Sequence, residues 1–576
     1  MCGIAGVVRY GRSPDEAAAR AMMRALRHRG PDGEGVAVAR SVALAHTRLA
    51  LIDAAHGAQP MASPDRRFWL TYNGEVYDHI ELRAELRERW DFRTRTDAEV
   101  VLAACATWGW RDAARRFNGM FAFFLWDDLR QEGVLVRDRL GVKPAVWARV
   151  DGGVAFASEA KALLAAGLVA PRAHAPSLVE YLVAPCFSGV EHGMFEDVEH
   201  VPAGGALVVR ADGHEIESWW RFAFAPEERE DHVVRVRERL PEAARLATRA
   251  DVPVAGLLSG GLDSTALCAL ARPDATFSVR FDDQARFDYA ASGIVISDDG
   301  PYVELAARSL GLRNVDVFVS RSTLREDLRA LAATDDALPA WEQEVAQRHL
   351  ARAVARTHKA VLVGDAADET HWGYHFLLDD EATRTPSTIL SRLGAVPLAT
   401  EPVAVARARL VAHYEDLASA AGHPWDRDPL LATGWLVVAR WLARLLHNGD
   451  VHTMAFGLEA RVPFADVPLV ELARRVPPPA ALANGEKAVL RAALRGLIPE
   501  PIRTRRKSAL PKDQGSAEVL RAAARDAVEC SSFVRTWIDA SAVRSLTDGR
   551  PLQERDRAAL FRVACLGEWA DLYGAR

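Results

Sequence analysis

A short glycine-containing segment between a strand and a helix is the feature that most limits the fold of this chain. The apolar run 252–258 leads directly into Ser259-Gly260-Gly261-Leu262-Asp263-Ser264, and a helix-forming stretch follows. Glycines at this point let backbone N–H groups approach a phosphate closely, and the N-terminus of the following helix favours an anion. No Gly-Lys-Ser/Thr follows, so the segment is neither a Walker A loop nor a dinucleotide fingerprint. We predict a phosphate site of another type, in which Asp263 can face a phosphate-bound metal.

The residues around this loop have the pattern of an α/β domain. Short apolar runs at 252–258, 275–281, 315–319 and 360–363 alternate with helical stretches such as 264–271 and 302–310. Strands that alternate with helices form βαβ units, so we expect a parallel sheet. Beyond about residue 380 the spacing of Ala, Arg and Leu predicts mainly helices.

The first 220 residues have a different pattern, with many short strands and few helices. Helical spacing is present at 14–27 and 80–89. The Trp219–Trp220 pair indicates a domain edge after the last strand, and the charged, proline-containing stretch 224–231 indicates a linker. The predicted strands are 4–9, 41–45, 68–72, 120–127, 133–138, 154–157 and 206–210.

Composition excludes several classes of protein. The 576 residues carry a formal net charge of −6, which argues against a nucleic-acid-binding protein. No run of about 18 uncharged apolar residues is present, so we expect no membrane span. The N-terminus does not have the pattern of a secretory signal. The 6 cysteines include no Cys-x-x-Cys, so the sequence indicates neither a zinc site nor a disulfide framework, and we expect the reducing cytoplasm as its location.

Cys2 is a candidate nucleophile because of its position. Removal of Met1 would give Cys2 a free α-amine beside its thiol. Such an amine has a pKa of about 7.7–8.0 and can act as the base for the thiol, so no separate histidine is needed.

These two signals occur together with a family resemblance that extends over nearly the whole chain. The chain resembles the glutamine-hydrolysing asparagine synthetases. The motifs that carry the resemblance in the first half are Cys2-Gly3-Ile4-Ala5-Gly6, His28-Arg29-Gly30-Pro31-Asp32-Gly33, Arg48-Leu49, Asn73-Gly74-Glu75-Val76-Tyr77, Thr96-Asp97, Gly119–Phe123, Arg137–Pro144 and Phe156–Glu159. Those in the second half are Ser259–Ser264, Gly364-Asp365-Ala366-Ala367-Asp368-Glu369 and Glu459–Phe464.

The resemblance implies two domains. Residues 2–220 would form a class II glutamine amidotransferase domain with the α+β N-terminal-nucleophile hydrolase fold, an αββα sandwich. Residues 221–576 would form an α/β PP-loop ATP pyrophosphatase domain, similar to the adenine nucleotide alpha hydrolases, with a helical C-terminal part. Dimerisation through the first domain is a further expectation from the family.

In the first domain, the resemblance assigns a role to each residue of a glutamine site. Cys2 would attack the side-chain amide of glutamine. The side chain of Asn73 and the backbone N–H of Gly74 would form the oxyanion hole. Arg48 would pair with the glutamine carboxylate, and Asp97 with Glu75 would hold the α-ammonium group.

In the second domain, the resemblance implies an ATP site with Mg²⁺. Asp263 and Asp368 would hold the Mg²⁺–pyrophosphate group, and Asp365 is a candidate catalytic carboxylate. Lys507 would lie near the activated intermediate. The residues expected to bind ATP are Leu257, Ser259, Gly260, Gly261, Asp263, Ser264, Ser278, Phe281 and Gly364, and those expected on the acceptor side are Glu459, Arg461 and Lys487.

Departures from the family pattern affect the identity of the acceptor. Asp365 stands where the best-known members have Glu, and Ala366-Ala367 replaces a Gly/Ser pair, which would stiffen the loop. The segment 334–342 lacks the Arg that bacterial asparagine synthetases place there for aspartate, and residues 290–297 look like an insertion. We therefore expect the acceptor to be aspartate or another carboxylic acid of a specialised pathway.

The implied function is a ligase that hydrolyses glutamine, carries ammonia through an apolar internal tunnel, and amidates an acyl-adenylate to give an amide, AMP and pyrophosphate. Its partners would be glutamine, ATP and a carboxylic acid. One alternative is an intramolecular amide-forming cyclase of the β-lactam synthetase or lasso-peptide type, which often lacks the N-terminal Cys or its glutamine pocket. A second alternative is a non-enzymatic stress or interaction protein, which would not need the intact Ser259–Ser264 loop and Asp368.

Lysine is unusually rare in this chain. Only Lys143, Lys161, Lys359, Lys487, Lys507 and Lys512 occur among 72 basic residues. Where Arg is the default cation, a surviving Lys is expected where a compact point charge is needed.

Overall fold

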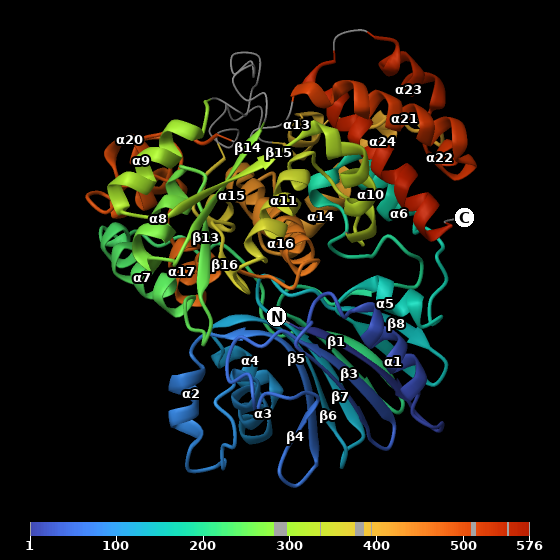
Figure 1. Cartoon of the computed structure of the whole chain (residues 1–576), viewed down its shortest axis with the longest axis vertical. Helices are drawn as coiled ribbons and strands as arrows, with labels where there is room; N and C mark the ends of the chain where they lie inside the picture. Colours follow the sequence, from blue (N-terminus) through green and yellow to red (C-terminus); the bar gives the residue numbers. More distant parts are fainter. Residues whose placement is uncertain are drawn as a thin grey trace.

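The computed structural model describes residues 2–281, 297–334, 336–374, 385–392, 394–508, 514–549 and 552–574. Figure 1 shows the first domain, blue to cyan, beneath the second, which runs from green to red. The N-terminus lies between the two domains, next to the strands of both. This arrangement puts the start of the chain close to the second domain.

The first domain contains two antiparallel sheets of six strands. One has the order β10 (Glu199–His200), β8 (Val146–Val150), β9 (Gly153–Ala157), β1 (Gly3–Arg9), β3 (Val42–Arg48) and β2 (Gly33–Val38). The other has the order β12 (Gly213–Ser218), β11 (Gly205–Arg210), β7 (Glu132–Arg137), β6 (Gly119–Asp127), β5 (Phe68–Val76) and β4 (Met61–Ala62).

The two sheets bury a core between them. Ile4, Leu44 and Trp126 belong to this core, and the rings of Phe124 and Phe156 stack with centroids 4.3 Å apart. Helices cover the outer faces: α1 (Glu16–Ala25), α5 (Ala160–Ala165) and α6 (Ala175–Val183) on one, and α2 (His79–Leu86), α3 (Asp97–Trp108) and α4 (Trp110–Arg116) on the other. The αββα sandwich is therefore confirmed.

The second domain is built on one parallel sheet. Its order is β15 (Asn314–Val319), β14 (Thr276–Phe281), β13 (Val254–Leu257), β16 (Ala360–Leu362) and β17 (Glu459–Arg461). Strand order reverses between β13 and β16. Ligands of open α/β sheets bind beyond the carboxyl ends of the strands at such a reversal. The loops after β13 and β16 carry the Ser259–Ser264 and Gly364–Glu369 motifs.

Helices flank this sheet and make up most of the chain beyond it. Those before residue 380 are α7 (His232–Leu246), α8 (Leu262–Ala271), α9 (Gly300–Leu310), α10 (Leu324–Thr334), α11 (Gln343–Val354) and α12 (Ala367–Thr370). Those after it are α13 (Pro386–Arg392), α14 (Val403–Ala420), α15 (Pro429–Leu436), α16 (Ala443–Met454), α17 (Val467–Ala473), α18 (Pro478–Ala481), α19 (Ala488–Ala493), α20 (Glu500–Arg503), α21 (Ala517–Cys530), α22 (Ser532–Trp537), α23 (Ala540–Thr547) and α24 (Glu554–Tyr573).

One continuous helical stretch, Pro429–Met454, is long and apolar enough to cross a membrane by length and hydropathy alone. Its most apolar window is 61% buried inside the protein, as expected for a core helix of the second domain. It combines α15, a π-helical segment at Val437–Leu442, and α16.

Every strand predicted from the sequence is present, with shifts of a few residues at the ends. The strands that were not predicted are β2, β4, β8, β10, β12 and β17, which are short, polar or both. The strand expected to be the last of the first domain is β11, and one more strand, β12, follows it. After β12, Trp219 Nε1 donates to the Gly205 carbonyl at the start of β11 at 3.1 Å. The expected insertion at 290–297 lies outside the described residues except for Ser297.

Candidate active sites

Cys2 lies at the start of β1, at the edge of a small cavity in the first domain. Only 8% of the residue is exposed, and its backbone nitrogen donates to Asn73 Oδ1 at 2.9 Å. The adjacent Gly3 nitrogen donates to Thr47 Oγ1 at 3.1 Å, which fixes the strand end. The residues that line the cavity are Cys2, Arg48, Leu49, Leu51, Ile52, Gly57, Gln59, Tyr72, Gly74, Glu75, Thr96, Asp97 and Ala98.

The expected oxyanion-hole residues lie beside Cys2 on β5. Asn73 is fully buried, and its Nδ2 atom has no hydrogen-bond acceptor in the described structure. A free buried donor costs energy unless a ligand or water accepts from it. Gly74 is required here because a Cβ would lie 2.2 Å from the Met120 carbonyl oxygen on β6. The local geometry can therefore present one side-chain donor and one backbone N–H beside the nucleophile.

Arg48 and Asp97 both line this cavity, and hydrogen bonds hold each of them in place. The Arg48 guanidinium donates to the carbonyls of Ala54 at 2.7 Å and Asp53 at 2.8 Å. Asp97 is the first residue of α3. Its carboxylate accepts from the Tyr72 hydroxyl at 2.6 Å and from the Val76 nitrogen at 3.1 Å. A cation and an anion on one cavity match the two charged ends of an amino acid.

The thiol of Cys2 needs help to ionise. Burial raises its pKa above the ordinary value. No histidine lines the cavity, among the residues that the structure describes. The backbone nitrogen of Cys2 is therefore the best-placed base once it is a free amine.

Glu75, expected to hold an α-ammonium group with Asp97, lines the Cys2 cavity and also forms an ion pair across the domain interface. Its Oε1 atom lies 3.1 Å from Nη2 of Arg461 on β17, across the domain interface. Burial raises the pKa of Glu75 well above its usual range, although Arg461 partly offsets this. Glu459 Oε1 accepts from Arg461 Nε at 2.5 Å. Arg461, which Glu459 holds in place, thus contacts the first domain, whereas Lys487, expected with both on the acceptor side, bridges Asp263 and Asp368.

The loop after β13 has the geometry of a phosphate cradle. Ser264 Oγ, in the first turn of α8, accepts from the Ser259 nitrogen at 3.2 Å and lies 3.0 Å from Ser259 Oγ. Gly260 has φ +67°, and a Cβ there would lie 2.7 Å from the Val303 nitrogen of α9. This close approach explains why a glycine is needed.

Two carboxylates and two lysines meet beyond the ends of β13 and β16. Lys487 Nζ lies 2.5 Å from Asp263 Oδ2 and 2.6 Å from Asp368 Oδ1, and Lys507 Nζ lies 2.5 Å from Asp368 Oδ2. Burial would raise the pKa of Asp368, but Lys487 and Lys507 hold it well below its usual range. Asp368 is therefore an anion at any physiological pH.

These carboxylates fit a Mg²⁺ site that is completed by phosphate. Asp263 Oδ1 is buried and accepts no hydrogen bond in the described structure, and Asp368 Oδ1 lies 2.6 Å from Lys487 Nζ. Mg²⁺ is usually held by one or two carboxylates together with substrate phosphates. No group of three or more His, Cys, Asp or Glu residues suited to a metal occurs in the described part of the chain, so a Mg²⁺ at this pair would take further ligands from phosphate or water.

Asp365 lies near these groups, in the loop that follows β16. Burial, together with Asp368 and Asp263, raises the pKa of Asp365 to about 6, although Lys507 acts against the shift. Burial and Asp368 raise the pKa of Glu369 to about 7. The next residue after Asp365, Ala366, has φ +72°, a left-handed conformation that favours glycine. The alanine here therefore strains the loop as well as stiffening it.

The residues expected around the adenosine line the same end of the sheet. Ser278 Oγ donates to the Leu258 carbonyl at 2.5 Å, which joins β14 to the end of β13. Phe281 ends β14 and lines a second small cavity with Val319, Leu324 and Val345. Leu257 and Gly364 are half-buried at the ends of β13 and β16.

The segment 334–342, apart from Asp335, contacts other parts of the protein. Asp336 lies 3.7 Å from Lys161 of the first domain, and the Ala337 carbonyl accepts from Arg444 at 3.3 Å. Glu342 lies 3.0 Å from Arg557. The cations near this segment are thus already engaged by protein groups.

Comparison with known proteins gives the family. A family model described as a glutamine amidotransferase domain matches residues 1–220, and one described as asparagine synthase matches residues 235–571. The chain belongs to the glutamine-hydrolysing asparagine synthetase family. This synthetase is therefore a carbon–nitrogen ligase with glutamine as amido donor.

Several curated relatives resemble the synthetase over most of their length. Asparagine synthetase [glutamine-hydrolyzing] 3 of Bacillus subtilis is 30% identical, over 89% of this chain and 87% of that protein. Asparagine synthetase B of Escherichia coli is 28% identical, over 88% and 81%. A Penicillium rubens protein named amidase chyE is 27% identical, over 82% and 81%.

All five lysines in the described part of the synthetase lie within 4.0 Å of a carboxylate. Lys143 is the most buried and lies 3.5 Å from Asp450. The prediction that each surviving Lys serves a specific point charge agrees with these contacts.

Sequence reasoning missed three residues that connect the synthetase's two domains near Cys2: Arg29, Lys143 and Asp450. Arg29 and Lys143 lie within motifs that carry the family resemblance, but without a role of their own. The scarcity of lysine could have drawn attention to Lys143, whereas no sequence pattern distinguishes Asp450 on its helix.

Proposed function

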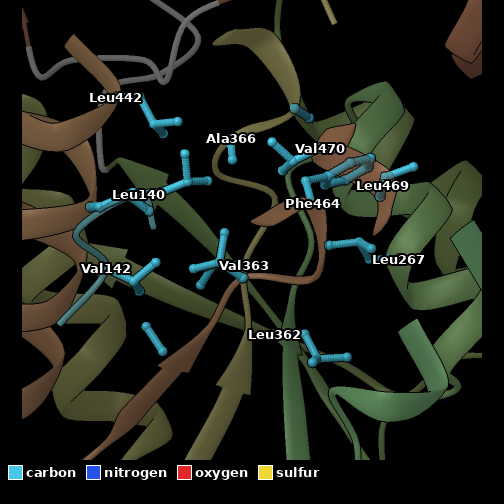
Figure 2. Packing of buried hydrophobic residues seen from close by; sticks show 14 of the residues in the cluster. Leu140, Val142, Leu267, Leu362, Val363, Ala366, Leu442, Phe464, Leu469 and Val470 are labelled. Carbon is cyan, nitrogen blue, oxygen red and sulfur yellow. The ribbon is translucent and has the colours of Figure 1, made fainter. Parts of the chain in front are cut away.

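We propose that this protein is an ATP-dependent amide ligase in which ammonia released at Cys2 travels inside the protein to an acyl-adenylate near Asp365. One observation carries the proposal. A continuous apolar cluster includes Leu49 and Leu51 from the Cys2 cavity, as well as Val142, Val363 and Ala366. Figure 2 shows Leu140 and Val142 from the first domain beside Val363 and Ala366, which flank Asp365. Apolar walls keep ammonia from being protonated and lost to water.

At the first site, the α-amine of Cys2 would take the thiol proton, and the thiolate would attack the glutamine amide carbon. Asn73 Nδ2 and the Gly74 N–H would stabilise the oxyanion that develops. Arg48 and Asp97 would orient the two ends of glutamine. Collapse of the intermediate releases ammonia and leaves a thioester that water hydrolyses to glutamate.

At the second site, the acceptor carboxylate would attack the α-phosphorus of ATP, with pyrophosphate as leaving group. The Ser259–Ser264 loop would hold the phosphates, and Asp263 with Asp368 would hold Mg²⁺, which neutralises charge on pyrophosphate. Lys507 is placed to stabilise negative charge next to Asp368. Asp365 would accept a proton from the incoming ammonia as it forms the amide and expels AMP.

The acceptor would be aspartate or another carboxylic acid. The family names favour aspartate, since two of the relatives described above are named asparagine synthetase. Among the described residues around 334–342, Lys161, Arg444 and Arg557 already contact protein groups, and this supports an acid without a second carboxylate. That a relative is named an amidase shows that names within the family vary.

The intact glutamine site argues against the intramolecular cyclase. An enzyme that joins two groups of one substrate has no use for released ammonia. Cys2, Gly74, Arg48 and Asp97 all line one cavity, and Asn73 accepts from the Cys2 nitrogen beside it, which supports the glutamine-dependent reaction.

ATP–pyrophosphate exchange with a panel of acids, aspartate first, tests the second site. Exchange dependent on one acid, followed by AMP release when glutamine is added, is the expected result. Absence of both AMP and exchange with every acid would refute the proposal. Rapid asparagine formation with millimolar aspartate would identify aspartate as the acceptor.

The internal route is tested with Val142→Phe and a matched control. Val142 and Val470 are 4% and 3% exposed members of the same apolar cluster; the proposed route passes Val142, from the first domain, whereas Val470 lies on α17 of the second domain. Val142→Phe should stop AMP release supported by glutamine, while glutaminase activity and AMP release supported by NH₄Cl persist. Val470→Phe should affect all three activities equally. An equal effect of both variants on glutamine-supported AMP release would contradict the internal route.

A further inference from the structure

Helix α16 contacts both sites through two neighbouring residues. A Cβ added to Gly449 would lie 3.4 Å from Asp365 Oδ2, so the helix backbone lies against the candidate catalytic carboxylate. The next residue, Asp450, points about 100° further round the helix. Its side chain reaches the first domain. Two adjacent residues of α16 therefore contact Asp365 in the second domain and Arg29 in the first.

Asp450 is linked to Cys2 by one intermediate side chain. Arg29 Nη2 donates to Asp450 Oδ2 at 2.8 Å, and Arg29 Nε donates to the Cys2 carbonyl oxygen at 3.1 Å. Arg29 is 0% exposed and Asp450 is 2% exposed. Buried, charge-assisted hydrogen bonds of this kind have defined geometry, so a displacement of Asp450 is transmitted to the residue that carries the nucleophile.

Neighbouring charged residues hold the Arg29 side chain in the position that links Asp450 to Cys2. Arg29 Nη1 donates to Glu159 Oε1 at 2.7 Å, which anchors the guanidinium to the first domain. Lys143 Nζ lies 3.5 Å from Asp450 Oδ1, and it makes no hydrogen bond in the described structure. Asp450 therefore faces two buried cations of the first domain, and a change in its position alters the balance between them.

The helix also has a place where its register can change. The π-helical segment Val437–Leu442 leads directly into α16. Such segments are local irregularities of the helix and occur frequently at functional sites.

We propose that Asp450 is a positioning residue that couples the state of the ATP site to the orientation of Cys2. This inference rests on the proposed function for the ATP site. Ligand binding near Asp365 presses on α16 at Gly449, Asp450 shifts with the helix, and Arg29 moves the Cys2 carbonyl. A shift of about 1 Å at a nucleophile can change a rate by about 10²-fold. The consequence is that glutamine is consumed efficiently only when the second site is filled.

The test follows the rate at which iodoacetamide alkylates Cys2, read by mass spectrometry of the N-terminal peptide. The rate is measured with and without saturating ATP and MgCl₂, with saturation set by the ATP-induced rise in melting temperature. Asp450→Asn removes the charge with little change of shape. The matched control is Lys359→Met, because Lys359 forms another ion pair between the domains, 2.8 Å from Asp32.

ATP should change the alkylation rate by about 5-fold or more in the wild type and in Lys359→Met, the lower end of typical coupling between sites. In Asp450→Asn the ATP effect should vanish, although ATP still raises the melting temperature and NH₄Cl still supports AMP release. Should Asp450→Asn fold poorly, Asp450→Glu, which moves the charge by one methylene, is measured in the same way.

An ATP effect in Asp450→Asn equal to that in the wild type would overturn the inference. So would the lack of any ATP effect in a wild-type protein that binds ATP. If ATP does not bind the wild type, the proposed ATP site fails, and the rates without ATP decide the role of Asp450. Equal rates in Asp450→Asn and Lys359→Met would then refute that role as well.

Discussion

Nη2 of Arg461 lies 3.1 Å from Oε1 of Glu75, so that a side chain of β17 in the second domain forms an ion pair with a side chain of β5, the strand that carries Asn73 and Gly74. Both residues are buried, and Arg461 also donates to the carbonyls of Ala247 at 2.9 Å and Arg249 at 2.7 Å. This contact fixes the domain interface next to the nucleophile.

Arg461→Met should lower the free energy of unfolding by about 3–5 kcal/mol, because it removes the buried guanidinium that lies against the buried side chains of Glu75 and Glu459. The measurement is urea unfolding followed by tryptophan fluorescence. Adding Glu75→Gln and Glu459→Gln to the same chain should recover part of the loss. Arg111→Met, which breaks a surface pair with Glu217, is the control and should cost less than about 1 kcal/mol. Similar losses in Arg461→Met and Arg111→Met would contradict the role of this contact.

Cys2→Ala should abolish glutamine hydrolysis and glutamine-supported AMP release, while AMP release supported by NH₄Cl stays within about twofold, since only the nucleophile of the first site is lost. Glutamate and AMP are measured in parallel. Cys105→Ala is the matched control, because Cys105 is also a buried free cysteine but lies on α3 away from the cavity lining. Normal glutamine consumption by Cys2→Ala would remove the basis of the proposed mechanism.

The amount that the sequence could predict differs between the two sites. The Ser259–Ser264 loop was predictable because strand, loop and helix are contiguous, and Gly260 needs its positive φ locally. The pairing of Glu75 with Arg461 was not, because β17 is three residues long, includes two charges, and its arginine finds Glu75 only when the two domains meet. Asp450 was missed for the same reason: its partner Arg29 is 421 residues away in the chain. Local motifs are thus readable from sequence, but buried interdomain charges are not.

Asn73→Ala should lower kcat for glutamine hydrolysis by about 10²–10³ and change KM little, because the Nδ2 donor acts on the charge that develops in the transition state. Initial rates of glutamate release at several glutamine concentrations separate the two constants. Asn118→Ala is the control: Asn118 is a buried asparagine whose Nδ2 already donates to Asp466 at 2.7 Å. It should lower stability and leave kcat within several-fold. A large rise in KM with unchanged kcat in Asn73→Ala would assign Asn73 to ground-state binding instead.

Asp365→Asn should be inactive in AMP release yet more stable than the wild type at neutral pH. Burial raises the pKa of Asp365 from 3.8 to about 6, so the folded state holds this proton more tightly than the unfolded state does. Such a carboxyl group does not lower the free energy of unfolding below pH 3.8, where it is protonated in both states. Its destabilising effect grows as pH rises toward 6 and is complete above pH 6. Because asparagine cannot ionise, the stability difference between variant and wild type should grow from pH 5 to pH 7 and reach about 1–3 kcal/mol.

Urea unfolding at pH 5, 6, 7 and 8 measures this difference, with Asp539→Asn as a control of opposite sign. Asp539 caps α23, and hydrogen bonds from the Ser541 hydroxyl and nearby backbone N–H groups lower its pKa. Folding therefore favours the ionised form of Asp539, and its contribution to stability is lost as pH falls. Asp539→Asn should not raise the free energy of unfolding at high pH. If the difference in free energy of unfolding between Asp365→Asn and the wild type did not depend on pH, the pKa of Asp365 would not be raised in the folded state. A raised pKa could then not explain its role as the proton acceptor for ammonia.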